Sequence, residues 1–415
     1  MGSSTTFSQT GPSWACTHDM YTANTVTPSS ADQRLLQIEQ ARQAVMRENR
    51  SMTDLVVGSW FESAWIERSW RRCLATGQRP DQKVGFDILP AEARRRAEEA
   101  NHQLVQAARP VLSRLGRAIA NTRYFAILTD ANGIVIDTDG PIDRSDRRAQ
   151  LITRVGVDLS EKSVGTTAIG AALNELQSVW LHRGEHFFAE TSVYSCAGAP
   201  VFGPDGRCVG MLDLTGIQTA ERPELKHLVA QSARSIENAL TLTRPHSLLV
   251  RLNWPGRTLG DETDGLVCLD ADGWVTGANP TAREMVSQLG ATGAATPDTP
   301  ARPAIHSSEL FAMPFENLFD AAERGGMSDG LPLEVPLWSG LRLHALPASQ
   351  DHDTVPRSRP EASAGRLPLK DVEIALIRRA VDAARGNVMQ AARALGISRA
   401  TVYRKLGHKK PSSAL

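Results

Sequence analysis

The stretch GNVMQAARALGISRATVYRKL, from Gly386 to Leu406, decides the architecture of the C-terminal part of the chain. Asn387 is a favourable N-cap, and apolar residues follow at the i, i+3, i+4 and i+7 spacing of one helical stripe: Val388, Ala391, Ala392 and Leu395. Gly396 ends this helix, and Ser398 caps a second one whose Val402 and Leu406 face inward. Two short helices joined by such a turn are typical of a helix-turn-helix, whose second helix enters the DNA major groove.

The residues expected to contact DNA lie on the outer face of the second helix and in the basic tail behind it. They are Ser398, Arg399, Ala400, Thr401, Tyr403, Arg404, Lys405, Lys409 and Lys410. From Arg366 to the end we count eleven Lys or Arg and three acidic residues, a net charge of about +8, and the formally neutral chain therefore carries about −8 elsewhere. A local cationic excess of this kind supplies affinity for phosphates, so double-stranded DNA is the predicted partner.

A third helix is predicted from Lys370 to Ala384. Its apolar positions form a stripe broader than two small helices can cover: Ile374, Leu376, Ile377, Ala380 and Val381. Because operator-binding helix-turn-helix proteins usually work as symmetric pairs, we expect a homodimer. The whole segment from Leu369 to Leu406 resembles the Fis-type DNA-binding domain that ends many bacterial enhancer-binding regulators.

Length and composition limit which kinds of protein the rest of the chain can form. A chain of 415 residues with 41% hydrophobic residues is long enough for several domains with filled cores. No apolar run approaches the roughly 18 residues of a membrane span, and the N-terminus lacks the pattern of a secretory signal. The five cysteines are scattered and form neither a disulfide framework nor a zinc spacing. We therefore expect a cytoplasmic protein without cofactor, structural metal or enzymatic activity.

The middle of the chain repeats a strand, turn and strand pattern three times. The turns are Asn132-Gly133, Pro204 to Gly206 and Asp272-Gly273, each between short apolar runs. Helices are expected to flank the first two hairpins, from Val164 to Leu173 and from Pro223 to Leu242. The pattern predicts an α+β multidomain protein that combines antiparallel sheets with an all-α C-terminal domain.

Composition divides the chain into six segments. Residues 1–30 are polar and typical of disorder, 31–115 form a helical lead-in, 116–243 and 244–347 hold the two small sheets, 348–365 are a linker, and 366–415 carry the helix-turn-helix. Within the lead-in, a helix beginning at Pro90 is expected to end or kink at Pro110. Residues 290–303, rich in Ala, Pro and Thr, are interpreted as a loop.

Two parts of this middle region resemble the acetoin-catabolism regulator family. The first is S-W-x-R-C at Ser69 to Cys73. The second runs from Gly156 to Gly216 and resembles the GAF sensor domain of that family, on the pieces S-E-K-x-V-G-T-T-A-I-G, G-E-H-F and S-C-A-G-A-P-V with G-x-L-D-L-T-G after it. Where the pattern usually has Asn, this chain has Thr167. The third hairpin and N-P-T-A at Asn279 to Ala282 are faintly PAS-like.

A small-molecule site is predicted in the GAF-like domain, closed by Ser163 to Ile169. Its residues mix aromatic and polar side chains, as small-ligand sites do: His182, Glu185, His186, Phe187, Phe188, Tyr194 and Cys196. The resemblance implies a sensor of an effector. An alternative stays open, because His182 to His186 spell H-x-x-E-H, which on a helix binds zinc in a hydrolase. A metal or haem held by His182, Glu185, His186 or Cys196 is the corresponding sensor alternative.

The family that this chain resembles usually carries an ATPase between its sensor and DNA-binding domains, which remodels the sigma-54 form of RNA polymerase. Such an ATPase requires the phosphate loop G-x-x-x-x-G-K-[ST], and that motif does not occur here. The sequence thus predicts a ligand-responsive, DNA-binding regulator that acts by occupancy or by contacting RNA polymerase or another regulator.

Overall fold

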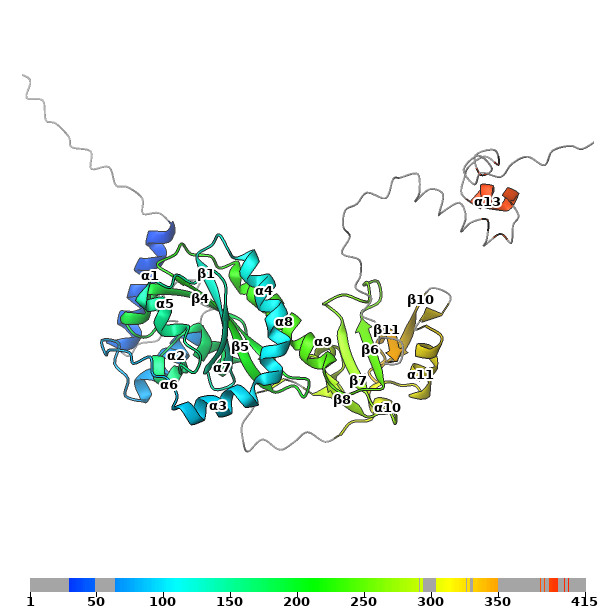
Figure 1. Ribbon diagram of the computed structural model, residues 1–415, viewed down its shortest axis with the longest axis horizontal. Helices are drawn as coiled ribbons and strands as arrows, with labels where there is room; N and C mark the ends of the chain where they lie inside the picture. The colour runs from blue at the N-terminus through cyan, green and yellow to red at the C-terminus, as the bar shows by residue number, and fades with distance from the viewer. Residues whose placement is uncertain are drawn as a thin grey trace, which may run out of the picture. The chain divides into compact units, whose positions relative to one another are not determined.

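The computed structural model describes residues 30–48, 64–290, 292–293, 304–325, 327–328 and 331–349, and in the C-terminal part residues 381, 384, 388–394, 399 and 402. The chain divides into two compact units, 1–350 and 351–415 (Figure 1). No helix of the described residues is long and apolar enough to cross a membrane.

The first unit opens with helices. They are α1 (Ser30–Met46), α2 (Ala64–Ala75), α3 (Ala91–Ala100) and α4 (His102–Ala118). The helix expected to begin at Pro90 is thus two helices that meet at Asn101, and α4 does not end at Pro110, which lies inside it. Pro110 is on the exposed side of α4, while Leu104, Ala108 and Leu112 are buried, so packing outweighs the lost backbone hydrogen bond.

The first sheet is antiparallel and has the strand order β2-β1-β5-β4-β3. Its strands are β1 (Tyr124–Asp130), β2 (Val135–Asp139), β3 (Val179–His182), β4 (Tyr194–Phe202) and β5 (Cys208–Ile217). The two predicted hairpins are confirmed, with Gly133 and Gly206 at the positive φ that their turns require. Sheet and helices together make the GAF-like α+β arrangement predicted from the sequence.

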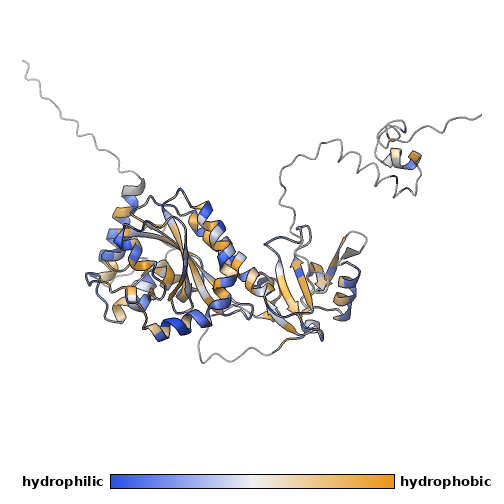
Figure 2. Ribbon diagram, in the orientation of Figure 1, coloured by the Kyte–Doolittle hydropathy of each residue, from blue (hydrophilic) through white to orange (hydrophobic). Residues whose placement is uncertain are grey.

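Each face of this sheet has its own core. On one face α4 and α8 (Leu225–Leu242) cover residues such as Tyr124, Leu212 and Leu214. On the other, α2 and α7 (Ala168–Glu175) cover residues such as Phe125, Ile127 and Met211. Figure 2 shows the strands largely hydrophobic and the solvent-facing α3 hydrophilic.

The helix predicted from Val164 to Leu173 is interrupted. Helix α6 (Glu161–Val164) ends before Gly165, whose φ is +67°, and α7 begins at Ala168 with the Thr167 side chain accepting a hydrogen bond from the Gly170 backbone N–H. A Cβ at Gly165 would lie 2.8 Å from the Phe188 ring, so glycine is required by both conformation and space. Because Thr and Asn are both good N-caps, Thr167 replaces the usual Asn without loss of this role.

A second antiparallel sheet has the order β8-β7-β6-β11-β10-β9. Its strands are β6 (Leu248–Asn253), β7 (Gly265–Leu269), β8 (Val275–Ala278), β9 (Met327–Ser328), β10 (Leu331–Pro336) and β11 (Arg342–Ser349). Without the edge strand β8 the order repeats that of the first sheet. The short helices α9 (Pro280–Met285), α10 (Ser307–Leu310) and α11 (Glu316–Glu323) cover one face. Strand β11 extends past residue 347, so Ala348 and Ser349 belong to the sheet and not to the predicted linker.

Contacts join the two sheets of the first unit. The Asn279 side chain donates to Asn238 of α8 at 2.7 Å, and the Ala278 backbone N–H of β8 donates to the Pro204 carbonyl at 2.9 Å. Gly293, in the stretch interpreted as a loop, forms a parallel bridge with Arg207. Hence part of that stretch is held by the hairpin of the first sheet.

The described part of the second unit contains α13 (Val388–Ala394), the first helix of the predicted helix-turn-helix. Ala392 and Val402 are buried against each other, with Val381 and Val388 packed around them. The predicted inward positions of both helices are therefore confirmed where they are described. Asn387, Leu406 and the dimerisation residues Ile374, Leu376 and Ile377 lie outside the described residues.

Candidate functional site

The predicted ligand residues follow one another along the edge of the first sheet. His182 ends β3, the short helix η3 (Arg183–Glu185) leads to His186, and η4 (Glu190–Val193) leads into β4 with Tyr194 and Cys196. Of the predicted set, His186, Tyr194 and Cys196 line an internal cavity. Phe187 and Phe188 instead pack against Gly165 of the segment that closes it.

The cavity lies between the sheet and residues 164–169, within the segment Ser163 to Ile169 that the sequence predicts to close a ligand site. The cavity is small. The centre of a water-sized sphere can occupy about 30 Å³ of it, which is room for one or two water molecules. Its walls are Phe86, Ile127, Ile152, Leu159, Val164, Thr167, Ala168, Ile169, His186, Thr191, Tyr194, Cys196, Asp213 and Thr215. Gly198 lets α7 approach the sheet here, since a Cβ would lie 3.0 Å from the Ala168 carbonyl oxygen.

Asp213 and Thr215, which lie on β5 next to Cys196 of β4, also line the cavity and were not among the residues predicted from the sequence. The Thr215 hydroxyl donates to Asp213 Oδ2 and lies 3.3 Å from the Cys196 thiol. Either the thiol or the hydroxyl can be the donor of that contact. Asp213 Oδ1 has no hydrogen-bond partner. The sequence feature that could have indicated them is G-x-L-D-L-T-G, in which Asp213 and Thr215 alternate with apolar residues inside a buried strand.

Burial sets the protonation of the polar groups around the cavity. It raises the pKa of Asp213 to about 7 and lowers that of His186 to about 4. His186 Nδ1 lies 2.9 Å from the Arg183 carbonyl oxygen and must therefore carry the proton, which leaves Nε2 as an unpaired acceptor. Burial also raises the pKa of the Tyr194 phenol and of the Cys196 thiol, so both stay neutral.

The geometry of His182 and Glu185 does not fit the metal-dependent alternative. Residues 182–186 form a strand end and a single 3-10 turn, not the α-helix that a zinc-binding H-x-x-E-H requires. His182 Nδ1 bonds Ser195 Oγ at 2.8 Å, and the Glu185 carboxylate accepts from the His182 N–H at 2.6 Å and from Arg34 at 2.8 Å. Within the described ranges no three His, Cys, Asp or Glu side chains are placed to hold a metal.

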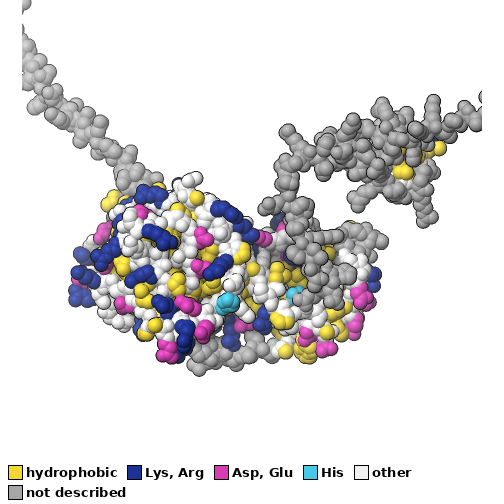
Figure 3. Space-filling model, viewed as in Figure 1, with side chains coloured by type: hydrophobic (Ala, Val, Ile, Leu, Met, Phe, Trp, Pro, Cys, Tyr) yellow, Lys and Arg dark blue, Asp and Glu magenta, His cyan; other side chains and the backbone are white. Residues whose placement is uncertain are grey.

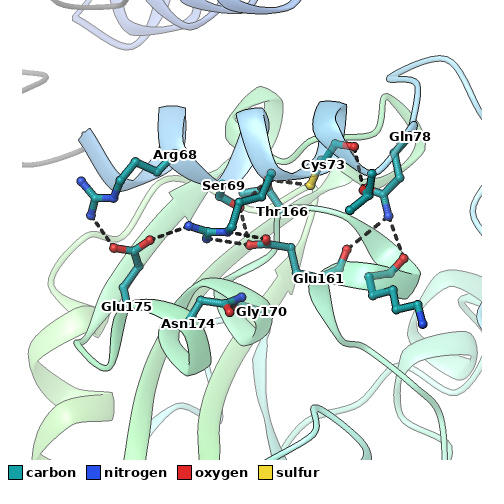
Figure 4. A network of polar contacts seen from close by, with 12 residues as sticks. Arg68, Ser69, Cys73, Gln78, Glu161, Thr166, Gly170, Asn174 and Glu175 are labelled. Carbon is teal, nitrogen blue, oxygen red and sulfur yellow. Dashed lines mark hydrogen bonds and ion pairs between the residues drawn. The ribbon is translucent and has the colours of Figure 1, made fainter. Parts of the chain in front are cut away.

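Helix α2 holds the segment that closes the cavity, through the residues of S-W-x-R-C (Figure 4). Arg72 donates to both oxygens of Glu161, at 2.7 and 2.9 Å, and to Glu175 at 3.0 Å. The Ser69 hydroxyl donates to Glu161 at 2.6 Å and lies 2.7 Å from that of Thr166. We call these contacts of Ser69 and Arg72 with Glu161, Thr166 and Glu175 the α2 clamp. The two sequence motifs that resemble one family thus meet in space.

The other side of the cavity is held by α1 and α2 together. Trp70 Nε1 donates to the Glu185 carbonyl at 2.8 Å. The Arg42 guanidinium lies 5.7 Å from the Trp70 ring centroid and donates to the carbonyls of Gly184, His186 and Phe187 at 2.7, 2.5 and 3.0 Å. These contacts fix the turn that carries His186.

Of the residues predicted to contact DNA, only Arg399 is described, and it is exposed. Ser398, Ala400, Thr401, Tyr403, Arg404, Lys405, Lys409 and Lys410 lie outside the described residues. On the face of the first unit in Figure 3, basic side chains are dispersed among acidic and hydrophobic ones.

Two family models match the chain. Residues 52–238 match the MimR N-terminal domain, and residues 368–407 match the bacterial regulatory protein, Fis family. Each of these matches covers less than half of the chain. The residues that match the MimR N-terminal domain include α2 and the cavity walls, whereas α1 precedes them.

Curated relatives that the chain matches are regulators of transcription. The acetoin catabolism regulatory protein of Cupriavidus necator is 32% identical over 269 residues, 62% of this chain and 38% of the relative. The acetoin dehydrogenase operon transcriptional activator AcoR of Bacillus subtilis and the propane 2-monooxygenase operon transcriptional activator MimR of Mycolicibacterium goodii are each 28% identical, over 42% of this chain and 29% of the relative. The chain therefore spans about a third of the length of these relatives. Their names agree with the expectation that the protein is not an enzyme.

Among solved structures, the DhaR(N)–DhaL complex of E. coli aligns with a TM-score of 0.41 and 14% identity, over 68% of this chain and 98% of the other.

The Asp213 carboxyl should make the stability of the fold depend on pH. Its pKa rises from 3.8 to about 7 on folding, so its contribution is fully present below pH 4 and is lost as the pH rises through about 7. Between pH 5.5 and pH 7 the contribution of Asp213 to the free energy of unfolding should fall by about 2 kcal/mol, because each pH unit changes it by about 1.4 kcal/mol. Urea unfolding should show a fall that is about 2 kcal/mol larger in wild type than in Asp213→Asn. Burial also raises the pKa of Glu185 to about 7 and that of Glu237 to about 8, and these two groups contribute equally in both proteins. Equal slopes in both proteins would contradict the assignment, since the remaining groups are shared.

The α2 clamp should stabilise the domain. Arg72→Ala should lower the free energy of unfolding by about 1–2 kcal/mol, a value that allows for water around the half-exposed guanidinium. Arg72→Lys should recover only part of it, because an ammonium cannot hold both carboxylates. The matched control is Arg79→Ala, whose ion pair with Asp81 is 75% and 70% exposed and should contribute nothing measurable. Equal unfolding midpoints for Arg72→Ala and Arg79→Ala would argue against the clamp.

Proposed function

We propose that this protein is a ligand-responsive, sequence-specific DNA-binding regulator of transcription that acts without an ATPase of its own. The observation that carries the proposal is one chain in which a match to the Fis family follows an α+β domain with a small, mostly apolar cavity whose lining residues include His186 and Asp213. Buried polar atoms without partners destabilise a fold unless a ligand or water satisfies them. Asp213 Oδ1 and His186 Nε2 are two such atoms.

In this proposal the C-terminal domain binds an operator as a homodimer in the cytoplasm. Arg399 and its predicted neighbours lie at the groove, and Lys405, Lys409 and Lys410 lie near phosphates. The absence of a phosphate-loop motif from the 415 residues supports regulation by occupancy or by contact with RNA polymerase or another regulator. The second sheet repeats the strand order of the first with one edge strand added, which supports a PAS-like domain at 244–347.

The effector signal is proposed to leave the cavity through the α2 clamp. The cavity is too small for most effectors as it stands, so a larger occupant must displace residues 164–169. Those residues continue from Glu161 and include Thr166, both bonded to α2. A ligand changes DNA affinity only by its differential affinity for two states, typically about 1–3 kcal/mol of coupling. Acetoin is a reasonable first effector to test, because two relatives regulate acetoin genes.

DNA binding should depend on the second helix of the C-terminal domain. Arg399→Ala should lower specific operator affinity by about 1–3 kcal/mol, the range for a side chain that contacts a base edge. Lys409→Gln should weaken all sequences alike and reduce the dependence of affinity on salt, because it removes a phosphate contact. Fluorescence anisotropy on operator and scrambled duplexes measures both. Unchanged operator affinity for both variants would refute the DNA interface.

The response to effector should require the sensor. A fragment that begins at Arg366 should bind the operator, with affinity independent of effector, whereas the full chain should respond. The matched full-length control is Arg72→Ala, in which the clamp is weakened and the response should shrink. An effector response retained by the fragment would show that the sensor lies elsewhere.

A further inference from the structure

We propose that Phe86 is the gate of the cavity, and that molecules enter the cavity by displacing the connection between α2 and α3. We call residues 80–90 of this connection the gate segment. The inference concerns the route into the interior. It goes beyond the proposed function, because the route is the same for any small molecule that reaches the cavity.

Phe86 is a cavity wall that also reaches the surface. Of the fourteen residues that line the cavity, all but Phe86 and Thr167 are buried. Thr167 is fixed as the N-cap of α7, where its hydroxyl accepts from the Gly170 N–H at 3.2 Å. The Phe86 side chain is held by apolar packing against the core of the first sheet. The wall is therefore easiest to open at Phe86.

The gate segment covers the cavity with one layer of chain. Gly85 and Asp87 are exposed on either side of Phe86, whose own side chain is half-buried. In an extended chain, successive side chains point to opposite sides. Phe86 thus points inward from a chain whose other side faces solvent, and no second element needs to move for the ring to swing out.

The gate segment is held at few points. It belongs to no helix or strand. The Val84 N–H donates to the exposed Glu190 side chain at 2.9 Å, and the Phe86 carbonyl accepts from the half-exposed Arg154 guanidinium at 2.8 Å. Segments with solvent-exposed hydrogen bonds and few buried apolar side chains open locally far more often than the whole fold unfolds. These contacts suit a gate that opens while the sheet stays intact.

Cys196 can report access to the interior, because it lines the cavity on β4. Burial raises the pKa of its thiol, so it should react with a thiol reagent only when the interior opens. Methyl methanethiosulfonate is a small uncharged probe: the thiolate attacks its sulfenyl sulfur, forms a methyl disulfide and releases methanesulfinate. Cys73, Cys208 and Cys268 are free and buried but do not line the cavity, and they serve as internal controls.

The test is the rate of modification of each thiol in the full chain, followed by peptide mass spectrometry. Phe86→Ala should raise the rate at Cys196 at least about tenfold and leave the three control thiols unchanged, because the rate follows the population of the open state. Phe86→Leu, which keeps an apolar plug, should give an intermediate rate.

Two further variants locate the gate. Ile88→Ala is the matched control, since Ile88 lies on the same segment, is 40% exposed and does not line the cavity, so the rate at Cys196 should stay near that of wild type. Arg154→Ala keeps the ring but removes the contact with the Phe86 carbonyl, so it should also raise the rate at Cys196.

Three results would overturn the inference. They are equal rates at Cys196 in wild type and Phe86→Ala, a similar rise at all four thiols, which would mean general loosening, and a larger rise in Thr167→Ala than in Phe86→Ala, which would move the entry to the start of α7. The measurement needs neither DNA nor effector, so its result stands whether or not the proposed function holds.

Discussion

The two-oxygen contact of Arg72 with Glu161 is the interaction on which the sensor depends most. Glu161 begins the segment that closes the cavity, and Arg72 belongs to a helix more than 80 residues earlier in the chain. A single half-exposed ion pair contributes little. Here Glu161 also accepts from Ser69, and Arg72 also holds Glu175, so the carboxylates keep their partners even where water reaches the guanidinium. The network thus ties α2 to the segment that covers the cavity.

The cavity itself is a local exception to the rules that stabilise the fold. Leaving a buried carboxyl oxygen and an imidazole nitrogen unpaired costs about 1–3 kcal/mol each. The surrounding packing tolerates this cost because Gly165 and Gly198 allow α7 and the Phe187–Phe188 pair to approach the sheet closely. Such unsatisfied polar atoms in an otherwise regular core are typical of binding sites.

Sequence reasoning was most successful where the signal is local. Turn residues located the hairpins, and helical spacing located Ala392 and Val402 in the core of the C-terminal unit. It was less successful where tertiary contacts decide. Pro110 lies inside a helix because one buried face holds α4 on the sheet, and Thr167 starts a helix that apolar periodicity placed three residues earlier. Asp213 was missed because nothing in the sequence tells which side chains of a buried strand face a cavity, and His182 and Glu185 were assigned to the site although their partners lie outside it.

The central claim is that occupation of the cavity is transmitted through the α2 clamp. Hydrogen–deuterium exchange of the full chain, with and without a saturating ligand, tests it most directly. We predict that exchange changes together in residues 160–169 and in α2, and that Arg72→Ala uncouples the two while ligand binding persists. A ligand that alters exchange around His186 and Asp213 but leaves α2 unchanged in wild type would contradict the account.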